Sequence, residues 1–291
     1  MSYKNVSYVG IALLVVGALL VASAEAVLVP PSGNIIWLDA EDPNGDGSAG
    51  PADGTPLAFW ADKSGIATPN DFTSYGEAPL YQSGVINGNA VLRHDGSVGL
   101  VSPWTLQYGA WTNFAVVKAD HGSNFLWERF GKDNLGMTSG LPGGAATTLL
   151  TVRVCCDGGV GISNAALDWG NTGVFQVVEA SYGGTLATSK LFQDGTAVSL
   201  EHSGSDGGIG IAGMQMRLGQ RPFAGGGGLI GDIAEFLMFD RTLTENERNT
   251  VGLYLADRYG VSTTYVPEPG TLTLLGAGLF GLLAYARRKR K

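Results

Sequence analysis

The stretch GDIAEFLMFDR, Gly231–Arg241, runs directly into TLTENERNTVGLYLADRYG, Thr242–Gly260. The first part contains a short apolar run, Ile233–Phe239, of the kind that forms a β-strand. In the second part, Thr244 and Glu247 have the Thr-x-x-Glu spacing of a capping box. Apolar residues then recur at helical spacing, and the final glycine is a typical helix stop. The two parts predict a strand followed by a helix that packs its apolar side on a sheet.

Similar β-favouring runs recur along the chain, separated by clusters of Gly, Asp, Asn and Ser. The other runs are Ile35–Leu38, Phe114–Val117, Phe125–Trp127, Leu149–Val154, Val174–Ala180 and Met214–Leu218. Lys190–Val198, with Asp194-Gly195 at its centre, is typical of a hairpin. The short strands and the 45 glycines predict an all-β fold, a sandwich of antiparallel sheets rather than βαβ units.

The N-terminus has the three parts of a secretory signal peptide. Lys4 supplies a positive charge, and Val9–Val21 is an apolar run of 13 residues. Ala22-Ser23-Ala24 and Ala24-Glu25-Ala26 both offer small-x-small cleavage sites. We therefore assign residues 1–26 to a signal peptide, because the apolar run is too short to favour a membrane anchor.

The C-terminus has a different three-part pattern. Val266-Pro267-Glu268-Pro269, which the prolines hold extended, is followed by Gly270–Ala286, a stretch of 17 residues without charge. A helix of that length is about 25 Å long, enough for a thin bilayer, and basic residues beside it stay cytoplasmic. We expect a transmembrane helix at 270–286, with Val261–Tyr265 as a short linker before the motif. The basic cluster consists of Arg287, Arg288, Lys289, Arg290 and Lys291.

This order of parts resembles the PEP-CTERM sorting signal of Gram-negative bacteria. The resemblance implies recognition by an exosortase, a membrane enzyme similar to transpeptidases, and removal of the tail. It also implies an exported precursor that is transiently anchored in the inner membrane, and a body delivered to the cell surface or extracellular matrix. Residues 262–291 are then linker and sorting signal, and residues 27–261 form the folded domain.

The mature body is strongly acidic. Residues 27–266 contain 12 Lys and Arg against 24 Asp and Glu, a formal charge of −12. We expect no nucleic-acid partner, because phosphate binding needs a basic surface. Divalent cations, or neutral and cationic polymers, fit the sign of this charge.

The two cysteines, Cys155 and Cys156, are adjacent in the sequence. Export permits a disulfide, but adjacent cysteines close only a strained ring. Buried reduced thiols, a vicinal bridge and a link to another chain are the alternatives. A metal site is not expected, because no second pair of Cys or His ligands lies nearby.

The sharpest local signal for a ligand is DPNGDGSAGPAD, Asp42–Asp53. It matches the D-x-N-x-D-G spacing of calcium-binding loops, whose oxygen ligands surround the ion. Position twelve is Asp instead of the usual Glu, and no flanking helices are expected. Calcium is thus the candidate cofactor, with a role in stabilising the loop, and the alternative is a polar loop without a metal. The candidate ligands are Asp42, Asn44, Asp46, Ser48 and Asp53.

Four stretches, in this order, resemble the concanavalin A-like, LamG-type domains of bacterial surface proteins. They are IWLDA (Ile36–Ala40), WADKSG (Trp60–Gly65), INGNAVLRHDG (Ile86–Gly96) and GDIAEFLMFDR (Gly231–Arg241). The resemblance implies a jelly roll of two antiparallel sheets, closed by the C-terminal helix. It also implies a binding role, often for carbohydrate, which makes an exopolysaccharide the candidate partner.

The carboxylates favour binding over catalysis. Glycan-cleaving relatives of this fold have a Glu-x-Asp-x-x-Glu run, which this chain lacks. Asp232 and Glu235 are three apart on the predicted strand, so we expect them on opposite faces and exposed to solvent. We therefore expect a protein that is not an enzyme, with glycan cleavage as the weakest alternative.

Sugar binding needs exposed aromatic rings with polar groups around them. The sequence does not choose among its candidates, so the carbohydrate-binding residues stay unassigned. A structural or adhesive matrix protein without a specific sugar site is the alternative. The aromatic candidates are Trp60, Trp104, Tyr108, Trp111 and Trp169.

Overall fold

The computed structural model describes most of the body and a few positions of the tail. The described residues are 30, 32–105, 109–120, 125–129, 133–137, 149–157, 160–168, 173–204, 208–209, 215–220, 228–266, 278, 280, 285, 287 and 288. The predicted signal peptide, 1–26, and most of the predicted transmembrane helix, 270–286, lie outside them. Within the described part of the chain, no helix is both long and apolar enough to cross a membrane.

The described strands form two antiparallel sheets, as predicted. The first has eight strands in the order β14–β13–β12–β7–β18–β5–β4, and β1 also pairs with β18. Its strands are β1 (Ile36–Asp39), β4 (Leu80–Ile86), β5 (Asn89–Asp95), β7 (Trp111–Ala119), β12 (Gln176–Tyr182), β13 (Lys190–Gln193), β14 (Thr196–Ala197) and β18 (Ile230–Phe239).

The second sheet has ten described strands in the order β15–β11–β10–β9–β8–β17–β6–β3–β2, with β16 paired to β10. Cys155 and Cys156 lie side by side in β10. Its strands are β2 (Phe59–Trp60), β3 (Phe72–Ser74), β6 (Leu100–Thr105), β8 (Phe125–Arg129), β9 (Asp133–Met137), β10 (Leu149–Asp157), β11 (Val160–Asp168), β15 (Leu200–Gly204), β16 (Gly208–Ile209) and β17 (Gln215–Leu218). A short 3-10 turn, η1 (Leu186–Thr188), follows β12.

Two tight turns that the sequence predicts connect neighbouring strands. Asp194-Gly195 joins β13 to β14 and Asn87-Gly88 joins β4 to β5, and all four residues have positive φ. Asn and Asp tolerate this backbone conformation better than other non-glycine residues, which explains the sequence signal. The amide of Asn87 also donates to the carbonyl oxygen of Arg258 at 2.9 Å, so this turn contacts the end of the C-terminal helix.

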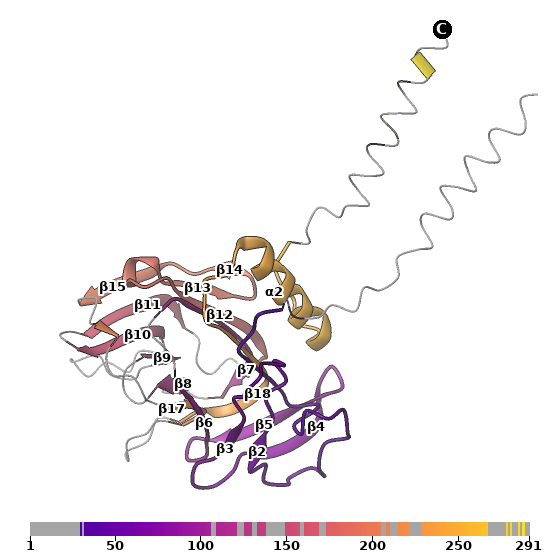
Figure 1. The fold of residues 1–291 in the computed structure, drawn as a ribbon, viewed down its shortest axis with the longest axis vertical. Coiled ribbons are helices and arrows are strands. Elements are labelled where there is room, and N and C mark those ends of the chain that lie inside the picture. Colours follow the sequence, from indigo (N-terminus) through magenta and orange to yellow (C-terminus); the bar gives the residue numbers. More distant parts are fainter. Residues whose placement is uncertain are drawn as a thin grey trace, which may run out of the picture.

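The predicted helix is α2 (Glu245–Tyr259), and its capping box is confirmed. The Thr244 side chain accepts from the Glu247 amide, the Glu247 carboxylate accepts from the Thr244 amide, and Gly260 ends the helix in the left-handed conformation. Figure 1 shows α2 against the side of the sandwich, where it contacts β7 and β12.

The eight-stranded sheet is the middle of three layers. In β7, Ala115 and Val117 point into the core between the two sheets, whereas Phe114 and Val116 belong to a second core under α2. Because both faces are covered, every residue of β12 and every residue of β18 after Ile230 is buried, including the polar Glu179, Asp232 and Glu235.

A β-bulge interrupts β18 where its neighbour changes. Residues Ile230–Ile233 pair with β5, and Glu235–Met238 pair with β1, with a register shift between Ile233 and Glu235 on the β7 side. Ile233 points into the core between the sheets, while Ala234 and Glu235 both face α2. The bulge therefore reverses the alternation of side chains beyond it.

The expectation for Asp232 and Glu235 was wrong on both counts. Asp232 binds Arg93 and Lys118, each at 2.8 Å, on the outer face of the sheet. Glu235 points toward the same face. Both carboxylates are fully buried. A strict two-residue alternation does not hold across the bulge, and α2 covers Glu235.

Candidate functional site

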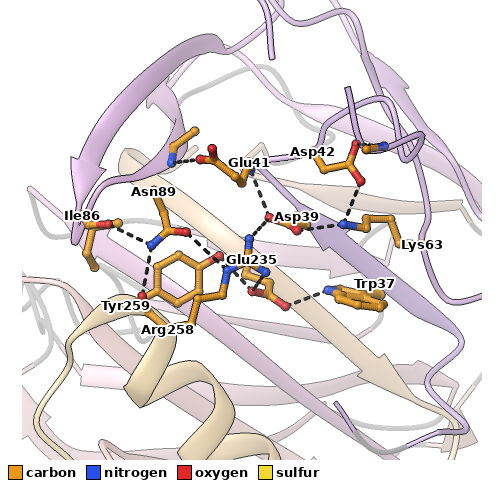
Figure 2. Close-up of polar contacts among 12 residues, drawn as sticks. Trp37, Asp39, Glu41, Asp42, Lys63, Ile86, Asn89, Glu235, Arg258 and Tyr259 are labelled. Atoms are coloured by element: carbon orange, nitrogen blue, oxygen red, sulfur yellow. Dashed lines mark hydrogen bonds and ion pairs between the residues drawn. The ribbon is translucent and has the colours of Figure 1, made fainter. Parts of the chain in front are cut away.

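The bulge places two buried carboxylates opposite each other on neighbouring strands. Glu235 of β18 is the direct partner of Asp39 of β1, and both side chains are nearly or fully inaccessible to solvent. Arg258 of α2 reaches both: its Nη2 atom lies 2.8 Å from Asp39 Oδ1, and its Nη1 atom lies 3.2 Å from Glu235 Oε2. Figure 2 shows these three side chains converging from three elements.

Both oxygens of Glu235 accept hydrogen bonds from the protein itself. Trp37 Nε1 donates to Oε1 at 2.7 Å, the Tyr254 hydroxyl donates to Oε1 at 2.9 Å, and the Tyr259 hydroxyl donates to Oε2 at 2.8 Å. Burial raises the pKa of Glu235 to about 7, and the charges of Asp39 and Arg258 act in opposite directions on it. A buried carboxylate needs such donors because it has lost its water.

Lys63 extends this group toward the predicted calcium loop. Its Nζ atom lies 2.9 Å from Asp39 Oδ2 and 2.9 Å from Asp42 Oδ2, and it sits over the ring of Trp37. We call this group the Glu235 cluster, and Figure 2 labels all its members except Tyr254. Its members are Trp37, Asp39, Lys63, Glu235, Tyr254, Arg258 and Tyr259. The carboxylates of Asp39 (β1) and Glu235 (β18) both bind Arg258 of α2. The cluster therefore joins these three elements.

The structure gathers only part of the predicted calcium ligands. Asp42 Oδ1 accepts from the Gly47 amide at 3.1 Å, and Asp46 Oδ1 accepts from the Ser48 amide at 2.9 Å. The Asn44 amide nitrogen lies 3.5 Å from Ser48 Oγ, so these residues share one turn.

Asp53 does not join that turn. Its Oδ1 atom accepts from the amide and the hydroxyl of Ser83, at 2.8 and 2.7 Å, at strand β4. In the described part of the chain, no group of three or more His, Cys, Asp or Glu side chains is placed to hold a metal ion. Calcium binding by this loop stays a prediction.

Two of the five aromatic candidates for sugar binding offer no exposed ring. Trp60 and Trp111 are fully buried in the core between the sheets. Tyr108 and Trp169 lie outside the described residues, and only the backbone of Trp104 is described, in β6. The sequence shows that these rings are large and apolar but not which side of a strand faces the core.

Two aromatic side chains that were not among the sequence candidates are exposed. Phe59 is 42% exposed and Tyr75 is 45% exposed. Phe59 pairs with Thr73, next to the pair of Trp60 and Phe72 that points into the core, so the Phe59 ring lies on the outer face of the second sheet. Tyr75 follows the end of β3, and its contact with Arg217 of β17 puts its ring on the same face, because the neighbours of Arg217 in β17 point into the core. The guanidinium of Arg217 lies over the Tyr75 ring, 3.7 Å from its centroid. The adjacent aromatics Phe59 and Trp60 were a usable signal, because neighbours on a strand point to opposite faces.

The segment before the sorting motif is not a free linker. Tyr265 is only 6% exposed, and its hydroxyl donates to Glu179 Oε2 at 3.1 Å. Val266, the next residue, is 63% exposed. Pro267, Glu268 and Pro269 lie outside the described residues, as do Lys289, Arg290 and Lys291 of the basic cluster.

Comparison with known proteins confirms the sorting motif. The model of the PEP-CTERM protein-sorting motif matches residues 266–291. The motif indicates an exported protein that an exosortase-type enzyme sorts to the cell envelope. No curated protein sequence matches the chain.

Solved structures with a similar fold share little sequence with this chain. The binding domain of botulinum neurotoxin serotype D/C VPI 5993 has a TM-score of 0.52 at 12% identity, over 77% of this chain and 52% of that one. A structure of botulinum neurotoxin type C has a TM-score of 0.50 at 11% identity, over 77% and 51%.

Domain 4 of AbnA, a GH43 extracellular arabinanase from Geobacillus stearothermophilus, has a TM-score of 0.47 at 15% identity, over 70% and 100%. The chain spans about half the length of the neurotoxin structures it matches. At these identities the likeness shows the β-rich fold alone.

The raised pKa of Glu235 predicts a pH-dependent stability. The folded protein binds this proton more tightly between the ordinary value of 4.5 and about 7, so the free energy of unfolding falls as the pH rises through that range. Glu235→Gln cannot titrate. We expect the difference in unfolding free energy, wild type minus variant, to fall by at most about 1.4 kcal/mol per pH unit.

Denaturant unfolding between pH 4 and pH 8 measures this difference. Glu201→Gln, at an exposed glutamate of β15, is the matched control and should give a curve parallel to that of the wild type. A Glu235→Gln curve that is also parallel to the wild-type curve would contradict the prediction.

The calcium prediction is tested by isothermal titration of the purified protein with calcium chloride. We expect saturable binding by the wild type and none by Asp46→Ala, because the central carboxylate of the loop is lost. Glu77→Ala, at an exposed carboxylate outside the loop, should bind like the wild type. Absence of heat with the wild type rules the site out.

Proposed function

We propose that this chain is an exported protein of the cell surface or extracellular matrix whose β-sandwich interacts with carbohydrate and does not cleave it. The observation that carries the export and sorting part of the proposal is the sorting motif at residues 266–291, attached directly to a folded body. In this proposal the tail binds the membrane transiently and is read by an exosortase-type enzyme. The body then works outside the cell.

Several features of the body support a binding role. Its sheets agree with the resemblance to LamG-type, concanavalin A-like domains, and its charge of −12 suits neutral polymers better than anionic ones. The similar structure of botulinum neurotoxin type C is reported with the finding that its cell entry depends on interaction with two ganglioside molecules. A sandwich of this kind is thus a reasonable carrier of a glycan-binding face.

Phe59 and Tyr75 are the proposed contacts with sugar. Their exposed rings can stack on the apolar face of a pyranose, and Arg217 holds the Tyr75 ring in place from the side of β17. The carboxylates of the Glu235 cluster are covered by α2 and bound by donors of the same chain, which supports a role without glycan cleavage.

One observation favours a second function. The aromatic candidates whose side chains the structure describes, Trp60 and Trp111, belong to the core and offer no platform for a sugar. A structural or adhesive matrix protein, held by protein contacts without a specific sugar site, is therefore the alternative.

The sorting part of the proposal is tested with the full chain in an exosortase-bearing bacterium. We expect the wild type to lose its tail and leave the membrane fraction. Glu268→Ala, which alters the centre of the motif, should keep the tail and remain with the membrane. Immunoblots of cell fractions measure both, and a strain without the enzyme is the control. Equal cleavage of the two chains would contradict this prediction.

The carbohydrate part is tested by co-sedimentation with the purified exopolysaccharide of the producing strain. We expect Phe59→Ala and Tyr75→Ala each to weaken binding by about fivefold, because a stacked ring contributes on the order of 1 kcal/mol. Val174→Ala removes an exposed apolar side chain elsewhere and is the control. No binding by the wild type would favour the structural alternative.

A further inference from the structure

The last residues of the body, Val261–Tyr265, form what we call the docked segment. The Tyr265 ring is buried in the space between α2, β12 and the β13–β14 turn, which we call the groove. The Tyr265 hydroxyl donates to Glu179, a fully buried residue of β12. Arg248 of α2 binds the same carboxylate, with Nη2 at 3.0 Å from Oε2, and stacks on the ring of Phe192. Tyr265 therefore supplies one of the hydrogen bonds to the buried ion pair between Glu179 and Arg248.

Gly252 makes room for the Tyr265 ring. A Cβ atom at Gly252, on the inner face of α2, would overlap that ring. Gly252 lies within α2, where no turn calls for a glycine. The contact with the Tyr265 ring explains why this position has no side chain. The groove thus depends on the absence of a side chain at one position of α2.

The backbone of the docked segment is held by the β13–β14 turn. The Thr264 amide donates to the Asp194 carbonyl at 2.8 Å, and the Thr263 hydroxyl donates to the same oxygen at 3.1 Å. The Thr264 and Thr196 hydroxyls lie 3.1 Å apart. Because the groove is built from β12, the β13–β14 turn and α2, it exists only in the folded body.

No free chain separates this groove from the sorting motif. The motif begins at Val266, directly after the buried Tyr265, and Val266 itself is exposed. Enzymes that cleave a peptide bond bind the chain on both sides of it in an accessible form. Residues fixed in a folded body enter such a site only after local unfolding.

We propose that the docked segment sets the upstream limit of tail processing, so that the enzyme cleaves at or after Val266 and never within Val261–Tyr265. The inference rests on the proposed sorting function and adds a residue-level determinant of specificity. Tyr265 and Gly252 act as positioning residues: they keep the body's last residues out of the enzyme's reach. When the peptide bond breaks, the carbonyl carbon of the body's last residue forms a new bond to the oxygen of water or the nitrogen of an amine acceptor. The proton that the acceptor loses goes to the new amino group of the released tail.

The experiment uses the full chain in an exosortase-bearing bacterium and locates the last retained body residue by mass spectrometry. Gly252→Ala displaces the ring, and Tyr265→Ala removes it without a change in α2. Tyr265→Phe, which keeps the ring and loses only the hydrogen bond to Glu179, is the matched control.

Chymotrypsin reports docking independently, because it cleaves after aromatic residues that it can reach. We expect it to cut Gly252→Ala after residue 265 about tenfold faster than the wild type, since the open population rises as docking weakens. In the bacterium, the wild type and Tyr265→Phe should end at or after Val266. Gly252→Ala and Tyr265→Ala should give additional ends within residues 261–265.

Two results would overturn the inference while leaving the sorting function intact. One is a wild-type end within Val261–Tyr265. The other is an unchanged end in Gly252→Ala and Tyr265→Ala although chymotrypsin shows that Gly252→Ala is undocked. A wild type that keeps its whole tail in the exosortase-bearing strain overturns the sorting function itself, and the inference with it.

Discussion

The buried charge of Glu235 is the constraint on which the arrangement of this body depends. A carboxylate without water is tolerated only where donors surround it, and removal of one partner leaves an uncompensated charge. Here the donors come from β1 and α2, which are far apart in the sequence: Asp39 of β1 and Arg258 of α2 are separated by 219 positions. The bulge in β18 turns Glu235 toward these donors. Strand pairing, helix position and the first strand of the domain are thus fixed together.

A second buried glutamate repeats the same solution closer to the end of the body. Glu179 is held by Arg248 and Tyr265, as Glu235 is held by Arg258, Tyr254 and Tyr259. Helix α2 supplies the arginine in both cases, so it is attached to the middle sheet by two buried ion pairs in addition to its apolar contacts. Through Tyr265, the second pair also connects the sorting end of the chain to the core.

The three layers separate the proposed sugar-binding face from the segment next to the sorting motif. The outer face of the second sheet carries the exposed rings of Phe59 and Tyr75, whereas the docked segment lies against α2, on the far side of the middle sheet. A body tethered through its C-terminus would therefore present its proposed sugar-binding face away from the tether. This division suits a protein that is processed at one side and binds its surroundings at the other.

The sequence by itself determined the features that depend on neighbouring residues. The apolar runs identified several of the longer strands, Asn87-Gly88 and Asp194-Gly195 identified two turns, and the spacing of Thr244 and Glu247 identified the start of α2. The sorting motif was also visible, because an enzyme reads it as a linear pattern. Only the tertiary structure decided which faces are buried. The bulge beside Glu235 arises where β18 changes partner. The buried position of Tyr265 depends on Glu179, 86 positions earlier in the chain, so no local pattern encodes either feature.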